Sequence, residues 1–578
     1  MKNDESTQSH EAKMTEEAAM AASQSLAYGK MDPENKLRLQ VDENPEEEGT
    51  PASKDFQYLA SLEMDFPRAS DLLMMVTVSA EVNKPKITSL AMSALEELTQ
   101  LALGQEAMWL VDPSSATYVL NEAEYRSRFS RLDPTLEKIL SLLKTEGPGE
   151  LPNLSGIVES FPIEDGPLQR QASQETQLVH SDLFHLVAMF MDVDQWSAVF
   201  SSVVSKAKVL GVLSTGENGS LDGALKVMMA EFHVPSPLVQ TRESYFLRYC
   251  KQLSSDTWAV VDASLESIFP NPATRFIRRP SGCLIQALGN GCSKVKWIEH
   301  VEADNTTIHY LFRRIVATGF AFHATRWLGT LARQCERNAA LMDHRVMILQ
   351  EGRKSLLTLT DRMMRSYFNG ISATRDNVWK PIPVIGAEDI LATTRYNFDD
   401  PRTPQGVAIA IATTIWLPTT PKGVFDFLRN GNLRSQWDLL SLNSNAKELV
   451  HINTGSDPAN NVSIIAVDTS PLIYYLQESQ ASPTGCYVVY APIEVLAMNS
   501  VLAGERTDDI QILSSGFAVL PDRPTLGEEE AGGTLLTIAF QICDKEASTA
   551  EYLPPKTVIT LHTIISQTAS LIRTAVMQ

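Results

Sequence analysis

The chain contains two long stretches whose landmarks recur in the same order. Gln195-Trp196 recurs as Gln436-Trp437, TWAVVDASLE as CYVVYAPIEV, RPSGCLIQ as LSSGFAVL, and HATRWLGTLARQCERN as LHTIISQTASLIRTAV. The separations between paired landmarks all lie between 229 and 241 residues. Four landmarks in one order at a nearly constant separation indicate a duplicated domain, so the fold has to be one that a chain can form twice in succession.

Each copy predicts the same series of elements. In the first copy, turn residues such as Asn290-Gly291 separate extended segments, namely AKVLGVLS, LKVMMAEFHV, SYFLRYCKQ, TWAVVDASLE, GCLIQAL and KVKWIEHVE. A helix with one apolar face follows, formed by Phe320, Trp327, Leu328, Leu331 and Cys335. The pattern predicts an α+β fold in which a curved antiparallel sheet is covered by a long C-terminal helix, twice over.

Four segments are expected along the 578 residues. Residues 1–70 carry 15 acidic and 7 basic side chains and predict a disordered acidic tail, acting either as an activation-type segment or as a solvated tail without a separate role. Residues 71–342 form the first domain, 343–375 a connecting helix, and 376–578 the second domain.

Two local features refine these segments. The stretch from Lys138 to Glu175 is rich in Gly, Pro and Glu, which predicts a long loop. In the connecting helix, Gly370 is a plausible C-cap, and one face is formed by Leu356, Leu359, Met363 and Tyr367.

Composition excludes several classes of protein. The net charge is −21, the isoelectric point is near 5.0, and no run of Lys or Arg exceeds two, all of which argue against direct nucleic-acid binding. The six cysteines show no metal-ligand spacing and fit a reducing compartment. Neither a secretory signal nor an apolar run of about 20 residues is seen, so a soluble intracellular protein is expected.

Catalytic motifs are also missing from the sequence. It contains no GxSxG, HExxH, phosphate-binding loop or dinucleotide-binding glycine loop. We therefore expect no enzyme, no catalytic residue, no metal and no cofactor.

Long stretches of the sequence resemble a known family. The segments DVDQWSAVFSSVVSKAKVLGVLSTG, WAVVDASLES, RRPSGCLIQALGNGCSKVKWIEHVE and RWLGTLARQCERNA resemble the START domain of plant class IV homeodomain-leucine zipper proteins. EGRKSLLTLTDRMMRSYFNG, VFDFLRNGNLRSQWDLLS and SSGFAVLPD resemble the START-associated domain of the same family. The resemblance covers about residues 71–578 and implies two START-like helix-grip domains, the first of which encloses a lipid or sterol-like ligand.

Members of this family carry a homeodomain and a zipper-like helix ahead of the START domain, and neither is found here. Two interpretations are open: a truncated gene product, or a paralogue that has lost its DNA-binding half. DNA binding is therefore expected only through a homeodomain that is not present in this chain. By resemblance, the partners are homologous family members and the location is the nucleus, with the cytoplasm as the alternative.

The candidate ligand site begins on the segment SYFLRYCKQ. Phe246, Arg248 and Cys250 alternate with Leu247 and Tyr249, so they share a face. Lipid-binding START domains often place an arginine on this strand inside the cavity, and Arg248 holds the matching position. Two interpretations remain open: Arg248 binds a ligand head group, or it pairs with Asp262 or Glu231 and binds nothing.

The rest of the predicted site comes from two later segments. On KVKWIEHVE, Trp297 and Glu299 share a face, and Glu299 is a pocket group, a partner of Arg248 or a rim residue. The closing helix contributes residues that are either core or ligand contacts. The predicted ligand-binding set is Phe246, Arg248, Trp297, Glu299, Phe320, Trp327 and Leu331.

The remaining polar residues predict structural roles. His300, His309 and His323 are scattered, and each is expected to be a hydrogen-bonded structural histidine. In the second copy, ion pairs and helix caps account for Asp426, Arg434 and Asp438.

The favoured hypothesis is a lipid-binding or sterol-binding regulatory protein, which resembles the ligand-sensing half of a transcription factor for epidermal cell differentiation. One alternative is a cytosolic lipid carrier, which would deliver its ligand to membranes. Another is a dominant-interfering partner of full-length homeodomain relatives.

Overall fold

The structure is a computed structural model, which describes residues 69–104, 107–112, 118–129, 168–270, 275–341, 350–397, 400–442, 444–469, 472–524, 532–544 and 554–577. Residues 1–68 of the predicted acidic tail and residues 138–167 of the predicted loop lie outside the described residues. Within the described residues, no helix combines the length and the apolar character needed to cross a membrane.

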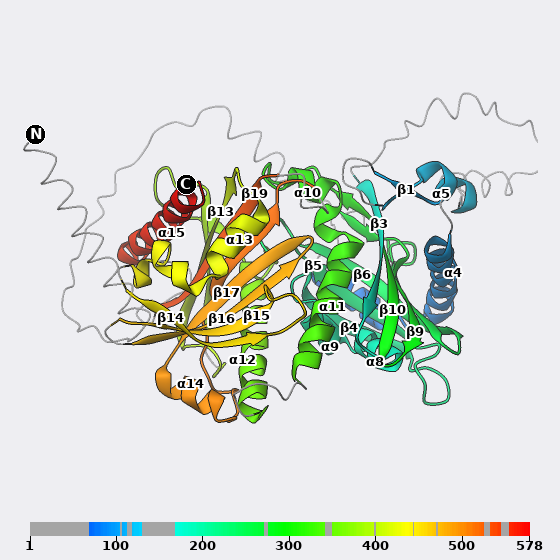
Figure 1. Cartoon of the computed structure of the whole chain (residues 1–578). Helices are drawn as coiled ribbons and strands as arrows, with labels where there is room; N and C mark the ends of the chain where they lie inside the picture. The colour runs from blue at the N-terminus through cyan, green and yellow to red at the C-terminus, as the bar shows by residue number, and fades with distance from the viewer. Residues whose placement is uncertain are drawn as a thin grey trace, which may run out of the picture.

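The first sheet has eight antiparallel strands in the order β3-β10-β9-β7-β6-β5-β4, with β8 also paired to β10 (Figure 1). Its hairpin β9–β10 turns at Asn290-Gly291, as predicted, and both residues have positive φ angles, 55° and 71°. The strands are β3 (Leu168–Val179), β4 (Val204–Ser214), β5 (Leu225–Phe232), β6 (Arg242–Ser254), β7 (Thr257–Ser264), β8 (Phe276–Arg278), β9 (Ser281–Gly289) and β10 (Cys292–Asp304). A separate hairpin joins β1 (Trp109–Val111) and β2 (Tyr118–Leu120).

The predicted loop is wrong over its last eight residues, because strand β3 begins at Leu168. It pairs antiparallel with β10 along its whole length. Its inward side chains include Gln171 and Ser173, which are buried although they are polar. A strand whose inward positions are polar lacks the apolar alternation by which strands are predicted.

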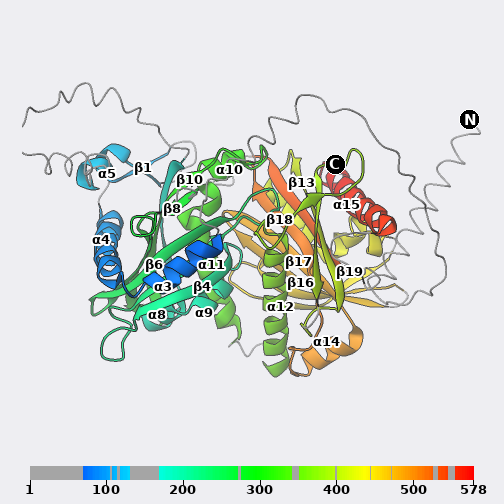
Figure 2. The ribbon, with the colours of Figure 1, turned by 180° about the vertical axis from the view of Figure 1, so that it is seen from behind.

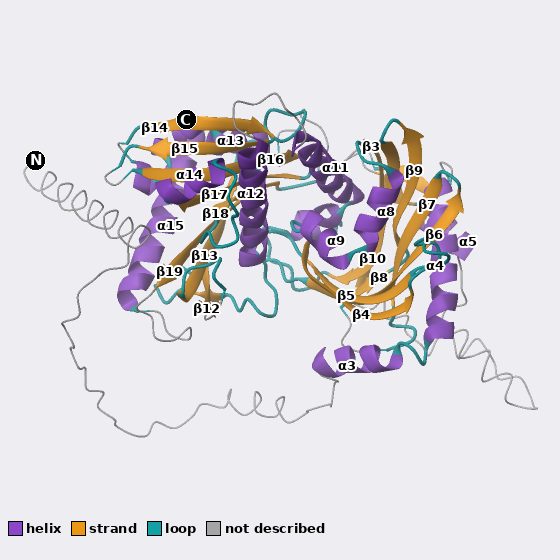
Figure 3. Ribbon diagram, turned by 90° about the horizontal axis from the view of Figure 1, so that it is seen from below, coloured by secondary structure: helices purple, strands orange, loops and turns teal. Residues whose placement is uncertain are grey.

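Helices cover both faces of this sheet (Figure 3). The face that bears Phe246 lies against the closing helix, and the opposite face lies against α4, where Leu98 and Leu101 are fully buried. The first group is α8 (Leu183–Met191), α9 (Val193–Val199) and α11 (Ala324–Leu341), and the second is α3 (Ala69–Ser79) and α4 (Lys84–Leu103). The remaining helices are α5 (Glu122–Phe129), α10 (Arg313–Ala317) and the 3₁₀ turn η1 (Phe320–Phe322).

The second sheet has nine antiparallel strands in the order β11-β12-β13-β19-β18-β17-β16-β15-β14. They are β11 (Lys380–Pro381), β12 (Ile390–Asn397), β13 (Gly406–Leu417), β14 (Ala446–Asn453), β15 (Asn461–Val467), β16 (Ile473–Ser482), β17 (Gly485–Ile493), β18 (Ser515–Pro521) and β19 (Thr534–Asp544). One face packs against α13 (Pro421–Arg429), η2 (Gly431–Gln436), η3 (Leu439–Ser441) and the closing helix α15 (Pro555–Val576). The other face packs against α12 (Gln350–Ile371) and α14 (Val495–Leu502).

The two sheets repeat one strand order, since β10-β9-β7-β6-β5-β4 corresponds to β19-β18-β17-β16-β15-β14. The repeated Ser-Gly landmark has the same physical cause in both. A Cβ atom on Gly282 would lie 2.1 Å from the carbonyl oxygen of Val260 on the neighbouring strand, and one on Gly516 would lie 2.4 Å from that of Val488. The predicted α+β fold class is confirmed.

The connecting helix α12 has a larger role than the sequence predicted. All four residues of its predicted apolar face are fully buried, against the second sheet. Gly370 does not cap this helix, which continues to Ile371. A Cβ atom on Gly370 would lie 2.0 Å from the side-chain nitrogen of Gln541, so glycine permits close packing of helix on sheet. Figure 2 shows α12 at the middle of the molecule, where the two sheets meet.

The closing helix of the first unit also contacts the second unit. Arg337 of α11 forms a buried ion pair with Glu478 of β16, and the same guanidinium donates to the carbonyl of Leu357 and the hydroxyl of Thr360, both 2.9 Å away on α12. Arg337 is 4% exposed and Glu478 is fully buried. Because its three contacts lie on two other elements, this arginine joins α11 to α12 and β16.

We predict that Arg337→Met lowers the free energy of unfolding by about 3 kcal/mol, because Glu478 would be left buried without this counter-charge. The double variant Arg337→Met/Glu478→Gln should recover much of that loss, since neither charge then remains. Denaturant unfolding measures both effects.

The matched control is Arg506→Met. Arg506 pairs with Asp508 at the surface, where its side chain is 91% exposed, so its loss should leave the free energy of unfolding nearly unchanged. Equal effects of the Arg337 and Arg506 substitutions would contradict the assigned role of the buried pair.

Candidate functional site

The interior of the first unit lies between the sheet and α11, and the predicted residues gather there. Phe246, Arg248 and Cys250 of β6 face this interior, and Leu247 and Tyr249 face α4, as the alternation predicted. From the other elements come Trp297 and Glu299 of β10, Phe320 of η1, and Trp327 and Leu331 of α11, all of them buried.

Arg248 is satisfied by groups of the protein itself. Its Nε and Nη2 donate to the two carboxylate oxygens of Asp262 at 2.7 and 2.8 Å, and its Nη1 donates to the carbonyl of Phe190 at 2.8 Å. The guanidinium also lies 4.0 Å from the ring centre of Trp196. Of the two predicted partners, Asp262 is therefore the one used, and Glu231 accepts instead from the hydroxyl of Thr241. A direct contact of Arg248 with a ligand stays a prediction.

Glu299 pairs with a second buried arginine, which the sequence analysis missed. Arg278 donates to the two oxygens of Glu299 at 2.8 and 3.1 Å, and the indole N–H of Trp297 donates to the same carboxylate at 3.2 Å. Burial raises the pKa of the Glu299 carboxyl, and the neighbouring Arg278 acts in the opposite direction. The alternation of the short strand Phe276–Arg278 is the sequence feature that could have indicated a buried Arg278, because the residues at both of its ends face inward.

The two pairs form one chain of charges. Arg278 Nε lies 3.6 Å from Asp262 Oδ2, so the order is Arg248, Asp262, Arg278, Glu299. Two positive and two negative groups balance, which reduces the free-energy cost of holding four charges in the interior.

Aromatic rings fill the space above these charges. Trp297 and Trp327 stack with their centres 4.9 Å apart at 13°, and Trp196 stacks on Trp327 at 6.3 Å and 12°. Arg278 lies 4.9 Å from the ring centre of Phe232 and 5.7 Å from that of Trp327. The interior between Trp327 and the sheet is therefore occupied by protein side chains.

A cavity of about 380 Å³ opens at the β3 edge of the sheet, between β3, β10, η1 and the β1–β2 hairpin, and Arg523 and Pro524 of the second unit also line it. Glu299 and Phe320 line it, whereas the other five predicted residues do not. Its walls combine Val301 and Phe322 with the polar groups of Gln171, Ser173 and His323. The volume is that of a site for a small molecule, and apolar walls with a few polar groups suit an amphiphilic ligand.

The histidines have structural roles, with one difference from the prediction. Burial lowers the pKa of His323 to about 4, and its Nδ1 is 2.8 Å from the hydroxyl of Thr325. His309 Nδ1 accepts from the backbone of Leu311. His300 lies on the α4 side, and neither of its ring nitrogens has a hydrogen-bond partner among the described residues; burial lowers its pKa.

The second unit repeats the buried arginine. Arg434 Nε donates to Asp438 at 2.7 Å, and the guanidinium lies 3.9 and 4.2 Å from the ring centres of Tyr475 and Tyr490. Asp426 pairs with Lys422 and Arg429 at the helix surface. The predicted ion pairs are present, and Asp438 also accepts from the backbone of Leu440 as a cap. In the part of the chain that the structure describes, no cluster of His, Cys, Asp and Glu could hold a metal.

Comparisons with known proteins identify both units. The START domain family matches residues 89–337, and the PDF2-like, C-terminal domain family matches residues 349–578. Human StAR-related lipid transfer protein 5, a solved structure, is 16% identical and covers 39% of this chain and 97% of its own, with a TM-score of 0.24.

Relatives resemble the chain over most of its length. Homeobox-leucine zipper protein HDG1 of Arabidopsis thaliana is 36% identical over 529 residues, which cover 86% of this chain and 62% of the relative. Homeobox-leucine zipper protein HDG11 of the same plant is 33% identical over 522 residues, which cover 86% of this chain and 67% of the relative. The chain thus spans 62% and 67% of the lengths of these two proteins, and it belongs to the family of class IV homeodomain-leucine zipper proteins.

Proposed function

We propose that the chain is the ligand-sensing part of a non-enzymatic regulator of this family. Its START unit would hold a lipid or sterol-like molecule, and occupancy would be transmitted to the second unit. The observation that carries this proposal is the position of α11, which covers the START interior with one face and pairs with Glu478 of the second sheet through Arg337.

The ligand would enter through the 380 Å³ cavity beside Glu299 and Phe320. Its apolar part would lie against Val301 and Phe322, and its polar group would meet Gln171 or Ser173. A larger ligand would need to displace the stacked Trp297 and Trp327. Because Trp327 belongs to α11, such a displacement would move the same helix that contacts the second unit.

This coupling favours a sensor over a carrier. A carrier has to release its ligand to a membrane, so a lipid-dependent contact with a second folded unit would serve it no purpose. By kinship with homeobox-leucine zipper proteins, the sensor would act in the nucleus, with related family members as partners and with transcription in epidermal cells as its target. Absence of such relatives from complexes isolated with this protein would contradict the proposed partners.

We predict that the purified protein takes up lipid from vesicles of phosphatidylcholine, cholesterol and oleic acid, as measured by mass spectrometry after the protein is re-isolated. Thr318 is exposed at the rim of the 380 Å³ cavity, so Thr318→Trp should fill the opening and lower uptake about tenfold. Recovery of the wild-type protein without any lipid would rule out the proposed function.

We also predict that the lipid-loaded protein melts at a higher temperature than the lipid-free protein, because a ligand that binds only the folded state adds about 2.7 kcal/mol at a concentration 100 times its Kd. Hydrogen exchange should slow in β16 and α12 as well as in the START unit. Unchanged exchange in those two elements would show that the ligand is bound without being sensed.

A further inference from the structure

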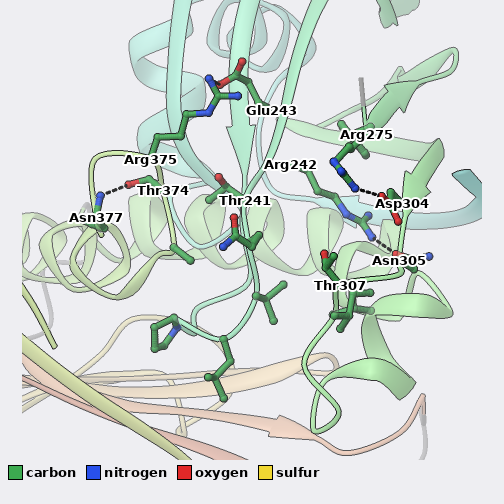
Figure 4. A pocket seen from close by; sticks show the side chains of 18 of the residues that line it. Thr241, Arg242, Glu243, Arg275, Asp304, Asn305, Thr307, Thr374, Arg375 and Asn377 are labelled. Atoms are coloured by element: carbon green, nitrogen blue, oxygen red, sulfur yellow. Dashed lines mark hydrogen bonds and ion pairs between the residues drawn. The ribbon is translucent and has the colours of Figure 1, made fainter. Parts of the chain in front are cut away.

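A second and larger cavity lies where the START unit meets the segment 373–379, which leads from α12 to β11. Its volume is about 770 Å³, and it shares no lining residue with the 380 Å³ cavity. Figure 4 shows its polar side chains. Arg242 and Glu243 belong to β6 and Thr241 directly precedes it, Arg275 comes from the segment before β8, and Thr374, Arg375 and Asn377 come from the segment after α12.

The wall formed by residues 373–379 is held in place by hydrogen bonds and ion pairs. Thr241 donates its backbone N–H to the carbonyl of Ala373 at 3.4 Å. Lys206 and Asp376 form an ion pair at 3.0 Å across the same boundary. The side-chain amide of Asn377 donates to the carbonyls of Asn369 and Ser372, both at 2.9 Å. These contacts hold residues 373–379 in place, so the cavity has an ordered wall on this side as well as on the side of the START unit.

One buried cation in this cavity has only neutral hydrogen-bond acceptors. Arg242 is 9% exposed and donates to the amide oxygens of Gln171 at 3.0 Å and Asn305 at 3.3 Å. Its guanidinium lies 4.2 Å from the ring centre of Phe322 and 5.5 Å from that of Phe276. Among the described residues, no carboxylate comes within ion-pair distance of it.

The other cations that line the cavity differ in this respect. Arg275 pairs with Asp304, and Arg375 lies 3.7 Å from Glu243. Burial lowers the pKa of Arg242 to about 9, and the carboxylate of Glu299, beyond ion-pair distance, acts in the opposite direction. Arg242 therefore remains charged at neutral pH. A buried charge with neutral partners favours the entry of an anion, because the anion supplies the missing charge compensation.

The walls around Arg242 also suit an apolar body. They include Val239, Leu265, Phe269, Phe276 and Trp379. Glu266 lines the cavity too, and burial raises its pKa to about 7, so that its protonated form can donate to an anionic oxygen.

We infer that this cavity binds a long-chain carboxylate, with its head group on Arg242 and its chain against the apolar wall. This inference rests on the proposed lipid-binding function and adds a second site with a stated head-group charge. Since residues 373–379 form one wall, a ligand here would contact both the START unit and the connection to the second unit.

The test compares binding of oleate and of oleyl alcohol by calorimetry, because the two ligands share a chain and differ in charge. Wild-type protein should bind oleate more tightly than oleyl alcohol. Arg242→Gln should weaken oleate binding about tenfold and leave the affinity for oleyl alcohol unchanged. Arg242→Lys, which keeps the charge, should retain part of the preference. Arg314→Gln is the matched control, because Arg314 is exposed on α10 and does not line the cavity.

A second variant keeps the test valid if Arg242→Gln fails to fold. Thr307 is exposed and lines the cavity (Figure 4), so Thr307→Trp should block oleate without disturbing the core. Equal binding of oleate and oleyl alcohol by the wild type would overturn the inference. The inference would also be overturned if Thr307→Trp bound oleate as tightly as the wild type does. If oleate binding were lost only in Thr318→Trp, the ligand would belong to the 380 Å³ cavity, and the proposed function would still stand. Failure of the wild type to bind any lipid would overturn both.

Discussion

Both sheets of this protein are apolar on both faces, so every face has to be covered. Phe246 and Leu247 are neighbours on β6 that point to opposite sides, and both are fully buried. Helices therefore lie in front of and behind each sheet, with α11 and α4 on the first and α15 and α12 on the second. Helix α12 packs on the second sheet, and the segment 373–379 that follows it contacts the first unit. The 770 Å³ cavity lies between this segment and the first unit.

Buried arginines recur within this architecture, and each is compensated in a different way. Arg248 and Arg278 share a chain of carboxylates with Asp262 and Glu299, and Arg434 combines Asp438 with the faces of two tyrosines. Arg242 donates to amide oxygens and lies against aromatic rings, and the carboxylate of Glu299 acts on it only from beyond ion-pair distance. A charge in a low-dielectric interior is stabilised by opposite charge more than by neutral acceptors. Buried Arg326 of α11 likewise donates to neutral acceptors, the backbone carbonyl oxygens of His233, Ala321 and Ser202. What sets Arg242 apart is that it also lines the 770 Å³ cavity.

Helix α11 connects the interior of the START unit to the second unit. Trp327 on one side stacks over the START interior, and Arg337, ten residues later, reaches Glu478 of the second sheet. A rigid helix transmits a displacement at one end to the other, so a ligand large enough to displace Trp327 would act on the contact with the second unit. The duplication thus produced two closing helices, and only α11 faces both the interior of its own unit and the neighbouring sheet.

The sequence by itself determined the duplication, the α+β class and the inward face of β6, because these depend on local periodicity that a chain carries wherever it folds. It also suggested Asp262 as one partner of Arg248. It did not predict β3, whose inward residues are polar, nor the packing of Gly370 against Gln541, nor the part played by Arg278. These features depend on residues far apart in the chain that meet only after the sheets close. The arrangement around Arg242 was likewise decided by tertiary structure, because Gln171 and Asn305 are 71 and 63 residues away from it.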